Sequence, residues 1–225
     1  MNFGIIISSN SRSISYLRAL IKNNISISKI IFLRDKNNKK VNQTIFKILK
    51  NIKEKKKIKI FDFKNINNSK ISDYLNKTEL KTFIVSLYSG ASGIIKNKNL
   101  LRRKKFIHSH PGKLPNYKGS TTIYYSILKE QKIWCDTFFL NEKIDEGNVI
   151  LSKKYPLPRN IHHIEKDYDI KIRTDNLIQS IKKLNLKKSM KVRVKAYKNL
   201  KKSKLNYYVI HPILRHIVYK KFQNV

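Results

Sequence analysis

Residues 106–150 read FIHSHPGKLPNYKGSTTIYYSILKEQKIWCDTFFLNEKIDEGNVI, and two short apolar runs in this stretch each lead into polar side chains. His108 and His110 follow the first run, and Asp145 follows the second. Two prolines and a glycine come next after the histidines, so neither a helix nor a central strand can continue there. The stretch therefore predicts strand ends that carry imidazole and carboxylate groups.

These three side chains have two interpretations. Imidazoles at a strand end suit proton transfer or metal binding, and a nearby carboxylate can orient a histidine and stabilise its charged form. An H-x-H pair with one distant carboxylate is a weak pattern for a metal site, and we expect no metal. From the spacing alone, a purely structural role for His108, His110 and Asp145 is the simpler interpretation.

Before this stretch, continuous apolar runs alternate with helical patterns. The runs are 3–7, 28–33, 57–61 and 82–87, and the helical patterns are 14–21, 44–49 and 71–75. Continuous apolar runs are typical of parallel strands buried on both faces. We therefore predict an α/β fold with a Rossmann-like, mostly parallel sheet and helices on both faces. The first run is not followed by G-x-G-x-x-G, so a nicotinamide cofactor is not expected.

The fourth run leads into a loop of small residues. These are Ser89, Gly90, Ala91, Ser92 and Gly93. Ligands of open α/β sheets bind at the carboxyl ends of parallel strands, and small residues let the backbone approach a flat ring closely. A plain strand-to-helix turn is the alternative interpretation.

After the central stretch, helical patterns recur at 167–184 and from 213, with a β-rich element at 206–212. Ser11 or Ser13 is expected to cap the first helix, and Ser120 or Thr121 the helix at 122–128. We predict a main domain over residues 1–185 and a short C-terminal appendage over 186–225.

The composition is strongly basic. Fifty Lys and Arg against 14 Asp and Glu give a formal charge of +36, which attracts polyanions such as nucleic acid. The alternative is coding bias, because lysine, asparagine and isoleucine are abundant throughout. No nucleic-acid-binding motif is present, so the charge supports only non-specific binding.

The single cysteine, Cys135, cannot form an intrachain disulfide and suits a reducing compartment; we expect it to be buried. The N-terminal apolar run is too short for a signal-peptide core or a membrane span. We therefore expect a cytoplasmic protein without membrane contact.

The central stretch resembles the signature of the folate-dependent formyltransferases, roughly N-x-H-P-S-x-L-P, a Y-[RK]-G segment, a helix, a strand and φ-D-x-G. The segments in register are His110-Pro111, Leu114-Pro115, Tyr117-Lys118-Gly119, residues 123–128 and Ile144-Asp145-x-Gly147. His108 stands where the family has asparagine, and the family's proline after the glycine segment is absent. The resemblance is strongest over residues 83–151.

This resemblance implies transfer of a formyl group from 10-formyltetrahydrofolate to an amine. It implies that His110 donates to the formyl oxygen, that Asp145 supports His110 and helps to remove the amine proton, and that His108 acts as a second donor. It also implies that residues 89–93, together with Asp145, contact the folate.

The acceptor is less defined. A second, β-barrel domain as in methionyl-tRNA formyltransferases does not fit in this length, so we expect a nucleotide-linked amino sugar. Methionyl-tRNA and glycinamide ribonucleotide are the alternatives, and a homodimer through the C-terminal segment is a further expectation. From another class, a non-catalytic basic protein that binds RNA or another anion with the same fold is also considered.

Overall fold

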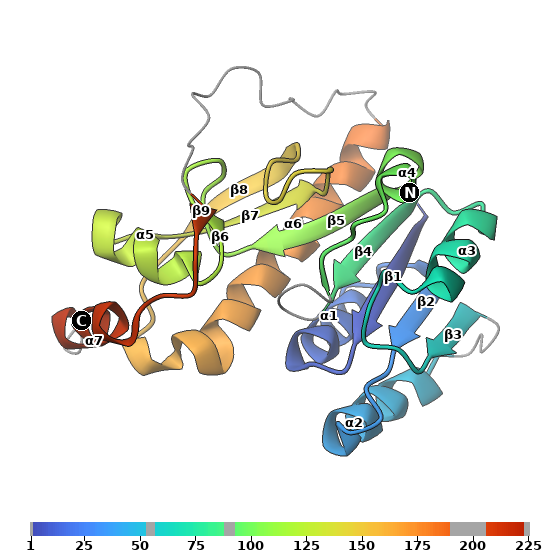
Figure 1. Ribbon diagram of the computed structural model, residues 1–225, viewed down its shortest axis with the longest axis horizontal. Helices are drawn as coiled ribbons and strands as arrows, with labels where there is room; N and C mark the ends of the chain where they lie inside the picture. Colours follow the sequence, from blue (N-terminus) through green and yellow to red (C-terminus); the bar gives the residue numbers. More distant parts are fainter. Residues whose placement is uncertain (1, 53–56, 88–92, 190–205, 223–225) are drawn as a thin grey trace. The chain divides into compact units, whose positions relative to one another are not determined.

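Figure 1 shows the computed structural model, which describes residues 2–52, 57–87, 93–189 and 206–222. The chain divides into two units, Met1–His108 and Ser109–Val225. Each unit is described by itself. No helix in the described ranges is both long and apolar enough to cross a membrane.

The first unit is built on parallel strands in the order β3-β2-β1-β4-β5. Their bounds are β1 Phe3–Ser8, β2 Ile27–Leu33, β3 Ile58–Phe61, β4 Thr82–Ser86 and β5 Lys105–His110, the last ending in the second unit. Every residue of β1 and β4 is buried, which explains why these strands read as continuous apolar runs. The predicted α/β class with a mostly parallel sheet is confirmed.

Helices cover both faces of this sheet. The helices are α1 Ser11–Lys22, α2 Lys39–Lys50, α3 Ser69–Lys77 and α4 Lys98–Arg103. The chain moves outward from β1 to β3, then returns to β4 and continues in the opposite direction to β5. Because crossovers between parallel strands are right-handed, this reversal places α1 and α2 on one face and α3 and α4 on the other. The packing agrees, since α1 contacts α2 and α3 contacts α4 (Figure 1).

One predicted helix cap is wrong, and a second occupies the N-cap position without making a capping bond. Asn10 caps α1, because its side chain accepts the Ser13 N–H at 2.8 Å, and the buried Ser13 hydroxyl instead lies 3.1 Å from the Ser86 carbonyl of β4. At the start of α5 (Thr122–Glu130), Thr121 has a left-handed φ of 49° and makes no capping bond. Its hydroxyl accepts the Ile210 N–H at 2.8 Å, so a tertiary contact replaces the local one.

The second unit joins an antiparallel strand pair to helices. Its elements are β6 Lys118–Gly119, α5, β7 Ile133–Phe139, β8 Val149–Tyr155, short helical turns at Ile161–His163 and Ile164–Tyr168, α6 Asp169–Ser189, β9 Asn206–Tyr207 and α7 Pro212–Lys221. Strand β7 pairs antiparallel with β8, and β6 pairs parallel with β9.

The C-terminal segment contributes to the core of this unit. Ile210, Val218 and Phe222 are buried in one apolar cluster with Tyr124 and Cys135. Cys135 is fully buried, as predicted, and burial raises the pKa of its thiol well above the ordinary value. The segment 206–222 is therefore packed into the fold of the second unit.

Candidate functional site

His110 ends strand β5 and is buried, with 4% of the residue exposed. Its Nε2 lies 2.7 Å from the Tyr117 carbonyl oxygen, and a carbonyl only accepts hydrogen bonds, so Nε2 carries a proton. The Thr122 hydroxyl donates to the Pro111 carbonyl at 2.9 Å and lies 3.2 Å from Nε2, so it can accept from the same N–H. Because Nε2 is fixed in this way, Nδ1 is the imidazole atom left for other partners.

Asp145 lies opposite that nitrogen. Its Oδ2 is 3.7 Å from His110 Nδ1 and accepts the Gly119 N–H at 2.8 Å. Asp145 lies between β7 and β8 with φ at 53°, a left-handed conformation that aspartate tolerates better than most residues. At 3.7 Å the contact is longer than a hydrogen bond, so it is an electrostatic contact between the two side chains. The structure thus places together a histidine and a carboxylate that lie far apart in the sequence.

One glycine leaves room for the histidine, and another leaves room for the loop that carries Asp145. A Cβ on Gly112 would lie 2.9 Å from both His110 Nε2 and the Tyr117 carbonyl oxygen, inside the hydrogen bond that fixes the ring. A Cβ on Gly147 would lie 1.6 Å from the Phe139 carbonyl oxygen. Sequence reasoning identified Gly147 through the D-x-G pattern, but no signal marked Gly112 as part of the histidine's surroundings.

A buried ion pair adjoins the carboxylate. Lys118 Nζ lies 2.9 Å from Glu146 Oε1, and the two side chains are 6% and 24% exposed. Lys118 is next to Gly119 and Glu146 is next to Asp145, so the pair joins the two segments that position Asp145. Sequence reasoning missed it, because no short-range spacing links residues 28 apart.

A polar network inside the second unit holds the end of β5. Ser109 Oγ lies 2.7 Å from Thr137 Oγ1 of β7, which donates to Asn176 Oδ1 of α6 at 2.6 Å. Arg173 donates to the Ser109 carbonyl at 2.5 Å. These contacts fix the residue immediately before His110 from two other elements.

Asp136 is a second buried carboxyl that sequence reasoning missed. It is fully buried on β7 and accepts the Leu114 N–H at 2.8 Å. Burial raises the pKa of Asp136 to about 6, against the opposing effects of hydrogen bonds from Ser152 and the Leu114 amide. Through this bond to the Leu114 amide, Asp136 anchors the loop that follows His110, in which the Leu114–Pro115 peptide bond is cis.

Comparison with known proteins shows the family of this chain. A family model described as "Formyl transferase" matches residues 1–176. The chain belongs to the formyl transferase family. A methionyl-tRNA formyltransferase of Prochlorococcus marinus is 30% identical over 195 residues, which are 85% of this chain and 54% of that protein. The chain thus spans about half the length of this curated relative.

Solved formyltransferases share the fold. A sugar N-formyltransferase from a Shewanella species superposes with a TM-score of 0.59 at 17% identity, over 97% of this chain and 86% of that chain. An N-formyltransferase from Helicobacter canadensis, solved with folinic acid and dTDP-3-aminofucose, has a TM-score of 0.58 at 17% identity, over 92% of this chain and 71% of that chain. At these identities the likeness shows the fold alone.

The remaining predicted site residues are in the first unit. His108 is partly buried on β5, two residues before His110. Of the predicted folate loop, Gly93 is described and partly buried, whereas Ser89, Gly90, Ala91 and Ser92 lie outside the described residues. The role of this loop and that of His108 stay predictions.

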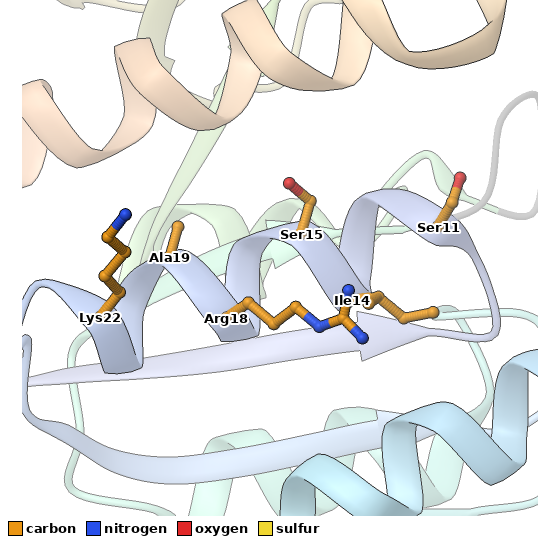
Figure 2. Close-up of a pocket in the computed structure, with 6 residues that line it drawn as sticks. All are labelled: Ser11, Ile14, Ser15, Arg18, Ala19 and Lys22. Carbon is orange, nitrogen blue, oxygen red and sulfur yellow. The ribbon is translucent and has the colours of Figure 1, made fainter.

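Metal ligands and a cavity are two further features that bear on possible sites. Within the described ranges, no group of three or more His, Cys, Asp or Glu side chains is placed to hold a metal ion. A cavity of about 450 Å³ runs along α1 and is lined by Ser11, Ile14, Ser15, Arg18, Ala19 and Lys22 (Figure 2). This lining contains no acid and no histidine, so it offers cations and hydroxyls without a group for acid–base chemistry.

Proposed function

We propose that this protein transfers a formyl group from 10-formyltetrahydrofolate to the amine of a small acceptor. The observation that carries the proposal is the pair formed by the buried His110 and the partly buried Asp145, with the histidine's Nε2 fixed on the Tyr117 carbonyl and its Nδ1 facing the carboxylate. Membership of the formyl transferase family supports the reaction class.

The residues suit the steps of this reaction. The acceptor nitrogen bonds to the formyl carbon, the carbonyl oxygen becomes anionic, and the bond from that carbon to the folate nitrogen then breaks. His110 in its charged form has an Nδ1–H in addition to the bound Nε2–H, and this second donor stabilises the oxyanion. Asp145 lies beside His110 and takes the proton of the attacking amine, directly or through water; that proton finally replaces the formyl group on the folate nitrogen.

His108 and the loop at 89–93 complete the proposal. A histidine N–H at position 108 takes the place of the family's asparagine amide as a second donor to the formyl oxygen. Residues Ser89, Gly90, Ala91, Ser92 and Gly93, with Asp145, contact the folate. No metal takes part.

For the acceptor we propose a nucleotide-linked amino sugar. The support is the fold shared with sugar N-formyltransferases, one of which was solved with dTDP-3-aminofucose. A sugar diphosphate also suits a chain with a formal charge of +36. Methionyl-tRNA is the second candidate, because curated relatives of this chain are methionyl-tRNA formyltransferases.

The test is a formylation screen read by mass spectrometry. Purified protein and 10-formyltetrahydrofolate are incubated with nucleotide-linked amino sugars, glycinamide ribonucleotide and charged initiator tRNA. The variant His110→Ala removes the proposed donor, and His216→Ala, an exposed histidine on α7, is the matched control. We expect one sugar nucleotide to gain a formyl group with wild type and His216→Ala, but not with His110→Ala.

Other outcomes of the screen are equally informative. Formylation of tRNA alone moves the acceptor to methionyl-tRNA. The absence of both turnover and folate binding, together with salt-sensitive RNA binding, contradicts the enzymatic proposal in favour of a basic anion-binding protein.

We also propose that two copies associate through the C-terminal segment. Val209 and Ile213 are 74% and 64% exposed, which leaves two large apolar side chains in water. Light scattering of wild type against Val209→Asp plus Ile213→Asp tests this. A monomeric wild type at working concentration contradicts it.

A further inference from the structure

The strand that pairs with β6 comes from the far end of the sequence. Lys118 and Gly119 of β6 are in parallel register with Asn206 and Tyr207 of β9. The Ser120 N–H donates to the Tyr207 carbonyl at 2.8 Å. A Cβ on Gly119, whose φ is 103°, would lie 2.1 Å from that carbonyl oxygen, so the two backbones approach as closely as glycine allows. Within the described chain, β9 is the only strand paired with β6.

The Tyr207 side chain strengthens this pairing. Its ring stacks on Tyr117 with centroids 5.6 Å apart and an interplanar angle of 23°, and it contacts Tyr125 of α5 at 4.4 Å. The Tyr207 hydroxyl accepts a hydrogen bond from Lys129 Nζ at 2.8 Å. Tyr117 is only 3% exposed, and its own hydroxyl donates to Glu130 at 2.6 Å. Tyr207 is therefore held by both ring packing and backbone bonds.

The segment that Tyr207 packs against is the one that positions the candidate catalytic pair. The Tyr117 carbonyl accepts from His110 Nε2, and the Gly119 N–H donates to Asp145 Oδ2. One backbone segment of three residues thus sets the orientation of the imidazole and of the carboxylate. Tyr207 contacts this segment at both ends, through its ring at residue 117 and through its backbone at residue 119.

From these contacts we infer that Tyr207 is a positioning residue for His110 and Asp145. Its ring and backbone hold residues 117–119 in the register that fixes His110 Nε2 and the Asp145 carboxylate. The inference rests on the proposed function for its effect on turnover, but its effect on the state of His110 is independent of any substrate. Small displacements of catalytic groups cost rate: a shift of about 1 Å can lower it on the order of 100-fold.

The experiment compares Tyr207→Ala, Tyr207→Phe and Tyr208→Ala. Tyr208 is adjacent and 82% exposed, so its truncation is a matched control for loss of a tyrosine in the same segment. Turnover is measured with the acceptor from the formylation screen, and the His110 ring nitrogens are followed by NMR of protein carrying ¹⁵N-histidine. The melting temperature reports on folding.

We expect Tyr207→Ala to lower kcat about 10- to 100-fold, with a smaller change in KM for the folate. The His110 Nε2 resonance shifts, because its bond to the Tyr117 carbonyl loosens. Tyr207→Phe keeps both rings in place. We expect its kcat to stay within about 3-fold of wild type and its His110 resonance to be unchanged within error. Tyr208→Ala matches wild type.

A folded Tyr207→Ala protein with wild-type kcat and an unchanged His110 resonance overturns the inference. If wild type catalyses no formylation, the proposed function fails but the resonance shift still tests the positioning role. If Tyr207→Ala does not fold, Thr121→Ala is measured in its place. The Thr121 hydroxyl accepts the Ile210 N–H and donates to the Tyr208 carbonyl. Removal of this hydroxyl loosens the same segment and leaves the Tyr207 ring intact. An unchanged His110 resonance in folded Thr121→Ala then counts against the inference.

Discussion

Lys118 and Glu146 form an ion pair of 2.9 Å in which the cation is almost fully buried and the carboxylate is a quarter exposed. Removing one partner of such a pair leaves the other charge without compensation, and the more buried charge is the more costly one to leave. We expect Glu146→Gln to lower the free energy of unfolding by about 2 kcal/mol, below the roughly 3–5 kcal/mol typical of fully buried pairs because Glu146 is partly solvated.

Removal of the lysine is expected to lower the free energy of unfolding by less than removal of the glutamate. Lys118→Met removes the buried charge and leaves Glu146 near solvent, with Lys143 at 3.9 Å. Urea denaturation of both single variants and the double variant gives the coupling energy. Equal costs for the two single variants contradict this asymmetry.

Asp145→Asn removes the negative charge of this residue but keeps an oxygen that can accept a hydrogen bond. The amide oxygen can still accept the Gly119 N–H, so we expect the melting temperature to change little. The loss of the negative charge beside His110 removes support for the imidazolium and the acceptor of the amine proton, and we expect kcat to fall about 100- to 1,000-fold. Steady-state kinetics test this, and a variant that keeps wild-type kcat excludes Asp145 from proton transfer.

His108→Asn introduces the residue that the family carries at this position. An amide always has an N–H to donate, whereas a neutral imidazole donates from only one of its two ring nitrogens. We therefore expect the variant to raise kcat several-fold, as measured by steady-state kinetics. An unchanged kcat in the variant indicates that His108 takes no part in the rate-limiting step.

Gly147→Ala tests the packing of the loop that carries Asp145. The new methyl would overlap the Phe139 carbonyl, so the backbone between β7 and β8 must move. We expect a loss of about 2–4 kcal/mol in the free energy of unfolding, together with reduced activity. Asn148→Ala, at an exposed neighbour, is the control, and thermal denaturation is the measurement. Equal stability of the two variants would show that the loop adapts without strain.

Asp136→Asn tests the effect of a buried carboxyl on stability. Because the pKa of Asp136 is about 6 in the fold and about 3.9 in an unfolded chain, the folded state binds more protons between these values. Its contribution to stability is therefore favourable at low pH and is lost as pH rises from about 4 to about 6. At pH 7 we expect the variant to be more stable than wild type by up to about 3 kcal/mol, a difference that vanishes near pH 4.

The control for this prediction is Asp73→Asn, at an exposed carboxyl on α3, which reports the general effect of removing one negative charge. Urea titrations at several pH values provide the data. A wild type that is the more stable protein at pH 7 contradicts the assigned burial of the charge.

The local parts of the fold were predictable from sequence because their causes are local. Strands β1 and β4 are buried on both faces and consequently read as unbroken apolar runs. His110 and Asp145 were found through a motif with intact spacing. The apolar pattern predicts the start of helix α2 at residue 44, although the helix begins at Lys39, because its first turn carries no apolar residue other than Val41.

Long-range partners could not be predicted in the same way. Nothing in the spacing pairs Lys118 with Glu146, and the apolar character of residues 206–212 indicated a strand without naming its neighbour. The caps failed for the same reason: Ser13 and Thr121 had suitable hydroxyls, but each is used by a contact from a distant part of the chain. A hydroxyl can bond to any donor or acceptor that the tertiary structure brings close, and the sequence alone does not identify that partner.

The bond between Thr121 and Ile210 spans 89 residues, and it belongs to the same contact zone as the pairing of β6 with β9. A chain growing on the ribosome therefore carries His110 and Asp145 long before it carries the strand that orders the backbone between them. Formation of such distant contacts is slow relative to local helix formation. Order at the two residues is thus expected to come late in synthesis, because a nascent chain that ends before Tyr207 lacks the contacts that this residue makes with residues 117 and 119.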